Sequence, residues 1–323
     1  MGDLHEQLRL FGFNELSRQA KGNPAMNRLM RAATAVLIEP EDEDLSFLHS
    51  GLCQTALPHT RPEDNAQPWE RRSTRASLIV EPGTSRGESG RFEYVGVPYG
   101  PEARLIMIYL QSEGVKNRIV PLGSSMSAWM RSLGLPVSGG KRGTIKEVKE
   151  QILRIANCSL KLEWEDDLAG GVVTSIERTT IVRGLKMWAE QPGRDKWPTH
   201  VELSREFHEH LKTHAVPLDK RAIAQLAGNS FALDLYATLA YRLPHLREPL
   251  HQRWSQLQGQ FGSSIEATHV FAFRLRKLLP TVLAVYEGAQ VDVSRTGLTL
   301  KPSKPPVPRT VVTVRGLTAL TPE

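Results

Sequence analysis

The chain has 323 residues, a formal net charge of +6 and a pI near 9.4. At roughly 100–200 residues per domain this length predicts two or three domains, and a hydrophobic content of 40% excludes global disorder. The modest basic excess permits a nucleic-acid partner but does not require one.

Two cysteines, Cys53 and Cys158, lie far apart in the sequence and form no CxxC motif. This spacing argues against a disulfide framework and indicates a reducing compartment. The first residues are polar and mixed in charge, unlike a signal peptide, and no run approaches the ~20 apolar residues that a membrane span needs. We therefore expect a cytoplasmic protein without a membrane partner.

Residues 1–38 follow a helical pattern that is interrupted at 22–24 by Gly, Asn and Pro. Residues 39–75 have the composition of a linker, because 39–44 hold five acidic residues and no basic one, and several prolines follow. We expect residues 1–75 to form an N-terminal extension that is helical at first and then acidic and proline-rich.

The next elements are two predicted strands, at 77–81 and 91–97, joined by a turn rich in Gly and Ser. A helix follows Pro101 and runs to about Gln111; Pro is favoured there because its missing N–H would have no partner. A short strand at 119–120 precedes a second helix at 125–133, whose apolar residues form one stripe.

A third helix is predicted to begin at Thr144, where Thr144 to Glu147 match a capping box. A Gly-rich basic loop, 139–143, precedes it. A hairpin follows it, with strands at 160–164 and 172–176 around a turn at 166–171. This order of elements is typical of a winged helix, in which the hairpin is called the wing.

A second block with a similar outline occupies residues 218–300. Its predicted helices lie at 219–227, 230–243 and 250–261, and a last long helix begins with a capping box at 263–266. The core stripe of that helix comprises Phe271, Leu275, Leu278, Leu279 and Val282, and Pro280 is expected to end or kink it. Strands at 291–294 and 298–301 enclose residues 295–297, a second wing.

The sequence thus predicts an α+β fold with two tandem winged-helix domains after a helical or disordered N-terminal extension. The expected boundaries are 1–75 for the extension and linker, 76–213 and 214–302 for the two winged-helix domains, and 303–323 for a flexible proline-rich tail. We expect the first domain to dimerise and contact phosphates, and the second to be the main DNA reader.

The chain contains near misses to known catalytic motifs. Residues 134–141 resemble a phosphate-binding P-loop, but Gly140 intrudes before Lys141, and Arg142 stands where Ser or Thr would bind magnesium. His208 and His210 lie two apart on a predicted helix and cannot face each other, so we expect a solvated face there.

Two further groups also favour structural roles. Cys158 ends a helix among apolar residues, where a cysteine is more often structural than nucleophilic. Asp166 and Asp167 fall in a predicted turn, where acidic residues are common for conformational reasons. We expect no catalytic residue, no cofactor and no metal, and therefore no enzyme.

The basic residues are more informative. Lys141, Arg142 and Lys146 surround the start of the third helix, whose N–H groups and dipole attract phosphate. The alternative is a solvated basic loop. The exposed face behind them, with Glu147, Glu150 and Arg154, is mixed in charge, so this helix is expected to dock by its N-terminal end.

The last long helix gives the sharper prediction. A projection at 100° per residue places His269, Val270, Phe273, Arg276 and Lys277 opposite its core stripe. Such a face suits the major groove, where apolar groups meet thymine methyls and Arg meets guanine. The alternative is that this face packs on another helix. Arg295, in the second wing, is a further expected DNA contact.

Several stretches carry a resemblance to a known family. They are residues 97–106 (VPYGPEARLI), 122–126 (LGSSM), 133–136 (LGLP), 139–143 (GGKRG), 231–236 (FALDLY), Trp254, 261–262 and 298–302 (LTLKP). Over about 77–307 the chain resembles plasmid-encoded replication initiators of the RepA type, those of broad-host-range IncW-type plasmids above all.

The resemblance implies a bacterial replication initiator that binds direct repeats, called iterons, in the double-stranded DNA of a plasmid origin. It implies monomers that melt the origin with a host initiator and recruit the replicative helicase, and dimers in equilibrium with them that repress the protein's own promoter. It also implies two winged helices, of which the second reads DNA more strongly. The chief alternative is a transcriptional regulator with two winged helices. A third class, a nickase, would need a metal or a nucleophilic Tyr.

Overall fold

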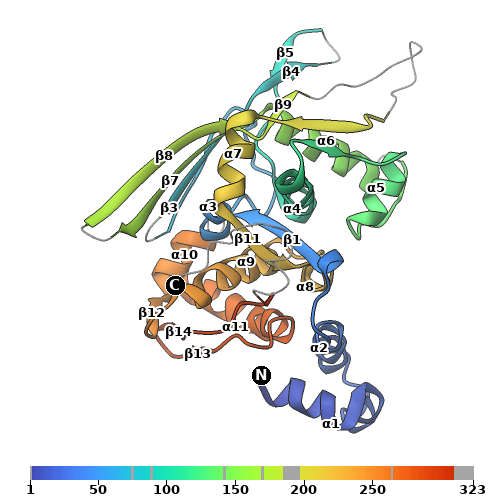
Figure 1. Ribbon diagram of the computed structural model, residues 1–323, viewed down its shortest axis with the longest axis vertical. Helices are drawn as coiled ribbons and strands as arrows, with labels where there is room; N and C mark the ends of the chain where they lie inside the picture. The colour runs from blue at the N-terminus through green and yellow to red at the C-terminus, as the bar shows by residue number, and fades with distance from the viewer. Residues whose placement is uncertain are drawn as a thin grey trace. The chain divides into compact units, whose positions relative to one another are not determined.

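The computed structural model describes residues 2–73, 76–87, 90–140, 143–168, 171–184, 197–262 and 265–308, with the backbone alone at 2–3, 164–168, 171–177 and 184. The chain forms two compact units. The terminal unit combines Met1–Ser46 with Val216–Glu323, and the central unit comprises Phe47–Ala215. The chain enters the central unit within strand β1 (Leu45–His49) and leaves it within strand β11 (Ala215–Asp219) (Figure 1).

The described residues of the central unit form three antiparallel sheets. The largest has the strand order β2 (Trp69–Arg72), β3 (Ala76–Glu81), β7 (Ser159–Leu168) and β8 (Gly171–Thr180). A three-stranded sheet has the order β6 (Ile119–Pro121), β10 (His200–Leu203) and β9 (Val182–Gly184), and β4 (Thr84–Arg86) pairs with β5 (Phe92–Tyr94).

This unit also contains helices. They are α3 (Ser50–Gln54), α4 (Gly100–Lys116), α5 (Met126–Ser132), α6 (Thr144–Asn157) and α7 (Arg205–His214). α4 is the central one, because it packs against both α6 and α7 and most of its residues are buried. Figure 1 shows the long β7–β8 hairpin extending from this unit.

The terminal unit is mostly helical. Its elements are α1 (Gly2–Gln19), α2 (Pro24–Ala35), the short 3₁₀ helix η1 (Asp42–Asp44), α8 (Lys220–Leu226), α9 (Ser230–His245), β12 (Leu250–Arg253), α10 (Trp254–Phe261), α11 (Thr268–Ala284), β13 (Val291–Val293) and β14 (Gly297–Leu300). Its three-stranded antiparallel sheet has the order β12, β14, β13.

One order of elements occurs in both units. Helix, strand, helix, helix, strand, strand describes α9, β12, α10, α11, β13 and β14, and equally α4, β6, α5, α6, β9 and β10. In both three-stranded sheets the last strand lies between the first and the second. The central unit differs by inserting the β7–β8 hairpin between α6 and β9.

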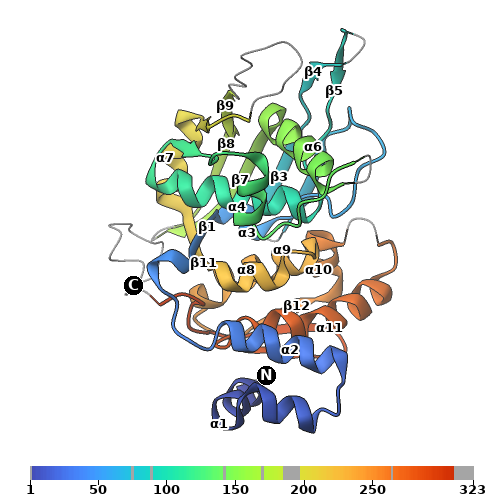
Figure 2. The same cartoon turned by 90° about the vertical axis from the view of Figure 1, so that its right-hand side faces the viewer.

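The N-terminal helices belong to the terminal unit. Asn23 caps α2 by accepting hydrogen bonds from two amides of its first turn, and α2 packs against α8 and α11 (Figure 2). From α1, His5 donates to the carbonyl of Ala284 (2.8 Å) and Arg9 pairs with Glu287. The division therefore differs from the expected one, because residues 1–46 form part of a folded unit.

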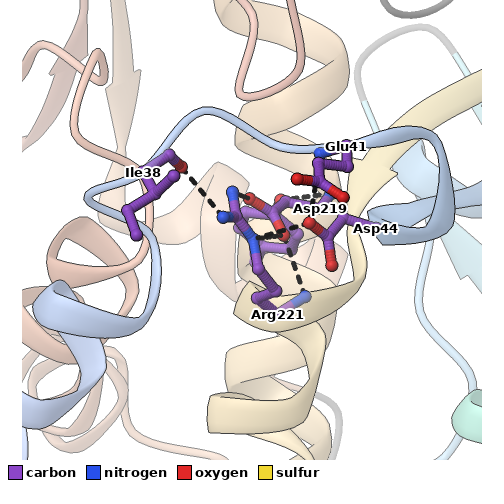
Figure 3. Close-up of polar contacts among 6 residues, drawn as sticks. Ile38, Glu41, Asp44, Asp219 and Arg221 are labelled. Atoms are coloured by element: carbon purple, nitrogen blue, oxygen red, sulfur yellow. Dashed lines mark hydrogen bonds and ion pairs between the residues drawn. The ribbon is translucent and has the colours of Figure 1, made fainter.

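An ion-pair cluster fixes the segment that follows α2 within this unit. Arg221 donates to both carboxylate oxygens of Asp219 (3.0 and 2.7 Å) and to the carbonyl of Ile38 (2.8 Å). Asp44 lies 3.6 Å from the same guanidinium (Figure 3). The acidic run at 39–44 is thus partly neutralised by a basic residue far along the chain.

Most predicted elements are confirmed, among them the first two helices, the strands at 77–81 and 119–120, and the helices at 125–133 and 144 onward. The interpretation of 39–75 as a linker is wrong. Residues 45–57 contribute buried side chains, including Phe47, Leu52 and Cys53, because a short apolar run there outweighs the prolines that follow.

The predicted hairpin exists, but its place and length differ. β7 pairs with β3, and the ladder extends through Asp166 and Asp167, which pair with Val173 and Val172. The expected turn at 166–171 is therefore wrong, since these carboxylate residues lie in a strand. The two residues between the strands, 169–170, lie outside the described residues.

Three further expectations are wrong in the terminal unit. Residues 250–253 form a strand paired with β14 rather than the start of a helix. α11 continues to Ala284, held by buried Val282 and Leu283, so Pro280 does not end the helix. The start of the tail is packed, because Tyr286 donates to the carbonyl of Lys304 (2.8 Å) and Val307 is buried; residues 309–323 lie outside the described residues.

Candidate nucleic-acid interface

α11 has two faces of opposite character. Phe271, Leu275, Leu279 and Val282 are buried, as the apolar stripe predicts, while Leu278 is half-buried. The opposite face exposes His269, Phe273, Arg276 and Lys277, with Val270 half-buried. The projection from the sequence is therefore confirmed for the exposure of these residues.

Phe273 is the unusual member of this face. It is 65% exposed, whereas Phe271, two residues before it, is fully buried beside Phe231. Phe273 is thus an apolar side chain that is exposed to solvent on a helix face that otherwise presents basic residues. Arg274, also exposed, adjoins it and was missed in the sequence projection. Its position three residues before Lys277 is the signal that could have identified it.

The charge on α11 is of one sign. Its sequence, THVFAFRLRKLLPTVLA, contains Arg274, Arg276 and Lys277 and no acidic residue. Such a helix favours a polyanionic partner, because every cation on it attracts phosphate without a neighbouring carboxylate of the same helix to repel it.

The start of α11 is built differently from the expected capping box. The helix begins at Thr268, and Ala267 provides no side-chain cap. The preceding turn is held instead by Gln258 of α10, whose side-chain amide donates to the carbonyls of Ile265 (2.7 Å) and Glu266 (3.0 Å). Residues 263–264 lie outside the described residues.

The β13–β14 turn lies beside α11. Ser294 closes it, since its N–H donates to the carbonyl of Gly297 (2.9 Å) and its hydroxyl accepts from the amides of Thr296 and Gly297. Gly297 is required, because a Cβ there would lie 1.9 Å from the carbonyl oxygen of Gln252. Arg295 is exposed at the tip of the turn.

Trp254 connects this turn to the helices. Its backbone N–H donates to the carbonyl of Thr296 (3.1 Å) and its indole N–H to that of Arg295 (2.9 Å). The guanidinium of Arg276 lies over the indole, 4.7 Å from the ring centroid, and donates to the carbonyl of Ser294 (3.1 Å). Sequence reasoning missed this arrangement, because nothing in the spacing of 254, 276 and 294 indicates it.

In the central unit, Lys146 is exposed near the start of α6, and Lys141 and Arg142 lie outside the described residues. The first amides of α6 already have partners. Thr144 N–H donates to the Ser138 hydroxyl (3.1 Å), Ile145 N–H to the Ser138 carbonyl (3.2 Å) and Lys146 N–H to the Gly143 carbonyl (3.1 Å). A phosphate there would depend on basic side chains rather than on helix amides. Thr144 is the first helical residue, not the cap.

The expected exposed face of α6 needs one correction. Glu147 is exposed, but Arg154 is buried. Its guanidinium donates to Glu150 (2.8 Å), to Asn65 (3.1 Å) and to the carbonyl of Val97 (2.9 Å). Arg154 therefore organises the loop before α4 and is unavailable to DNA.

The histidines of α7 do not form the solvated face that we expected. His208 is buried, and the rings of His49, His210 and His214 form a cluster in which His210 stacks on His49 (4.8 Å) and on His214 (4.1 Å), with His49 and His214 5.6 Å apart. His49 Nδ1 accepts from Gly51 N–H (3.0 Å), so its proton lies on Nε2, which donates to Nδ1 of His210 (2.6 Å). Burial lowers the pKa of His49 well below its ordinary value, and His210 and His214 lower it further.

Three further questions concern a reactive thiol, a metal site and a membrane span. Burial raises the pKa of Cys158 to about 12, so its thiol stays protonated at neutral pH. Among the described residues no group of three or more His, Cys, Asp and Glu is placed to hold a metal ion. Within the same residues no helix is both long and apolar enough to cross a membrane.

A comparison with models of known protein families identifies the family of one region of the chain. Residues 97–257 match the family model described as "Plasmid encoded RepA protein". This region of the chain belongs to the plasmid-encoded RepA family. Membership supports a role in initiating plasmid replication, in agreement with the resemblance seen in the sequence. No curated protein matches the chain.

Two solved structures are similar in outline. A selenomethionine structure of domains 2 and 3 of RctB superposes with a TM-score of 0.49 at 13% identity, covering 79% of this chain and 99% of that one. A second structure of RctB domains 2–3 gives a TM-score of 0.47 at 14% identity, with 77% and 94% covered. At these scores neither likeness carries an argument about function.

Proposed function

We propose that this protein initiates plasmid replication by binding direct repeats of double-stranded DNA at the origin, with α11 as its main reading element. One observation carries the proposal: α11 exposes Phe273 and three cations on one face, free of carboxylates, next to a turn that exposes Arg295. This arrangement suits a helix in the major groove and a hairpin over the adjacent backbone.

The proposal includes two winged helices, one in each unit. Its support is the repeated order of elements and the common strand order in the two small sheets. The β13–β14 hairpin is then the wing of the terminal unit. In the central unit strands β9 and β10 then correspond to β13 and β14, so in this proposal the β7–β8 hairpin is not the wing; residues 185–196 lie outside the described residues.

We propose that the two units make different kinds of contact with DNA. The terminal unit reads sequence through His269, Phe273, Arg276, Lys277 and Arg295. The central unit contributes contacts to phosphate through Lys141, Arg142 and Lys146, and contributes to dimerisation. Such contacts are independent of sequence and position the protein on the duplex.

The partners that we propose follow from the family. Monomers would melt the origin together with a host initiator and recruit the replicative helicase, whereas dimers would repress the protein's own promoter. The alternative is a regulator with the same two modules and no part in initiation. Both bind DNA without catalysis, so we propose that the purified protein neither hydrolyses ATP nor nicks supercoiled DNA.

Footprinting on the DNA that flanks the gene separates the two functions. Protection of several direct repeats of one sequence, each bound by a monomer, supports the initiator. Protection confined to one inverted repeat supports the regulator, because a two-fold symmetric dimer binds a palindrome. No protection anywhere in the flanking DNA would contradict both.

A further inference from the structure

Arg276 has a structural environment unlike that of its neighbours on α11. Its guanidinium lies over the Trp254 indole, 4.7 Å from the ring centroid, and donates to the Ser294 carbonyl (3.1 Å). An Arg that stacks on a ring and hydrogen-bonds a backbone carbonyl is held in one orientation. The stacking fixes the plane of the guanidinium, and the hydrogen bond fixes the direction of its N–H groups.

Trp254 is equally constrained. It is buried at the start of α10, and both of its N–H groups donate to the β13–β14 turn, to the carbonyls of Thr296 (3.1 Å) and Arg295 (2.9 Å). Three consecutive carbonyls of the turn, those of residues 294–296, are thus held by Arg276 and Trp254 together. The turn has little freedom to move relative to α11.

We infer that Arg276 is a positioning residue, which fixes the distance between the reading helix α11 and the Arg295 tip so that both meet the DNA in register. The inference rests on the proposed function and refines it. His269, Phe273 and Lys277 then read bases directly, and Arg276 acts through the turn that carries Arg295.

The inference predicts a specific coupling. If Arg276 works through the turn, its replacement and that of Arg295 remove the same contribution, so their effects do not add. Arg295→Ala and Arg276→Lys should each weaken specific binding about tenfold, and the double variant should also weaken it about tenfold. Independent contacts would instead weaken the double variant about a hundredfold.

Arg276→Lys is the informative substitution, because it keeps the positive charge and loses the planar group that stacks on Trp254. Lys277→Ala is the matched control on the same face, and its effect should add to that of Arg295→Ala. Trp254→Phe gives a second variant, since it keeps the buried ring and loses the N–H that holds the Arg295 carbonyl. Thermal unfolding of each variant verifies that the terminal unit is folded.

The position of the loss along the DNA is a second readout. Hydroxyl-radical footprints of Arg276→Lys and of Trp254→Phe should lose protection at the nucleotides where Arg295→Ala loses it, and keep protection under α11. Additive losses, or a footprint altered only under α11, would overturn the inference. So would an Arg295→Ala variant that binds like the wild type. A wild-type protein that binds no repeated DNA would instead refute the proposed function.

Discussion

Arg221 and Asp219 form a bidentate ion pair, with two donor–acceptor distances of 3.0 and 2.7 Å, at the start of α8. This ion pair has two structural roles. Asp219 caps α8 through the Arg221 amide, and the Arg221 guanidinium reaches the Ile38 carbonyl and approaches Asp44 (Figure 3). The segment 38–44 therefore depends on a residue that is far from it in sequence.

Arg221→Ala should loosen that segment. The loss of charge-assisted hydrogen bonds to a buried carboxylate predicts a decrease of roughly 1–3 kcal/mol in the free energy of unfolding, and faster proteolysis between residues 36 and 44. Arg18→Ala is the control, because Arg18 is exposed and pairs with Glu15 one turn away. Equal proteolysis of the two variants would show that Arg221 does not hold the segment.

Phe271 and Phe273 test the two faces of α11. Phe273→Ala should leave stability nearly unchanged and weaken specific DNA binding, because the side chain is 65% exposed. Phe271→Ala should cost about 3–5 kcal/mol of stability, because its ring is fully buried. Denaturant unfolding and DNA titration measure both. A collapsed fold in Phe273→Ala would make that face structural.

Alanine substitutions at Gly96 and Gly123 separate the energetic cost of backbone strain from the cost of steric overlap. Both have positive φ (84° and 72°), but a Cβ on Gly96 would lie 2.1 Å from Arg154 Nη1, and one on Gly123 would meet no atom of the described residues within 4 Å. Gly123→Ala should lower the free energy of unfolding by about 1–2 kcal/mol, through backbone strain alone. Gly96→Ala should cost several kcal/mol, because it also displaces a buried charge from its partners. Equal losses in the free energy of unfolding, measured by chemical denaturation, would contradict the claim that a side chain at Gly96 displaces Arg154.

The stacked histidines make stability depend on pH. The pKa of His49 is lowered by burial and then by His210 and His214, and that of His210 is lowered by burial. The folded state therefore keeps both rings neutral below the ordinary pKa of about 6.5, where the unfolded chain binds protons, so stability falls as pH decreases through that range.

His49→Asn should flatten this dependence, since the amide oxygen can still cap α3 and cannot be protonated. The measurement is the free energy of unfolding at pH 7.5 and pH 5.5. The control is His200→Asn, at an exposed position on β10. A pH dependence that is the same in His49→Asn as in the wild type would show that the imidazole stack is not its source.

The sequence predicted the elements with clear periodicity well. The apolar stripes of α5 and α11 indicated helices that the structure contains, and the exposure of Phe273 followed from its place opposite Phe271 and Leu275. The capping boxes failed because caps depend on the neighbouring chain: Gln258 holds the turn before α11, and Ser138 holds the start of α6.

What the sequence could not predict are contacts between distant residues. Arg154 looks exposed by spacing, yet Glu150, Asn65 and the Val97 carbonyl compensate its burial. The pairing of β7 with β3, across about 80 residues, makes the expected wing part of another sheet. For the same reason the contact of Arg276 with Trp254 could not be predicted from the sequence.

The most direct test of the central claim is the salt dependence of binding to DNA that carries the direct repeats. If Lys and Arg neutralise about six phosphates, the slope of log K against log salt is roughly −5, and the repeats bind far more tightly than random DNA of equal length. A slope near zero, or equal affinity for repeats and random DNA at every salt concentration, would contradict the account.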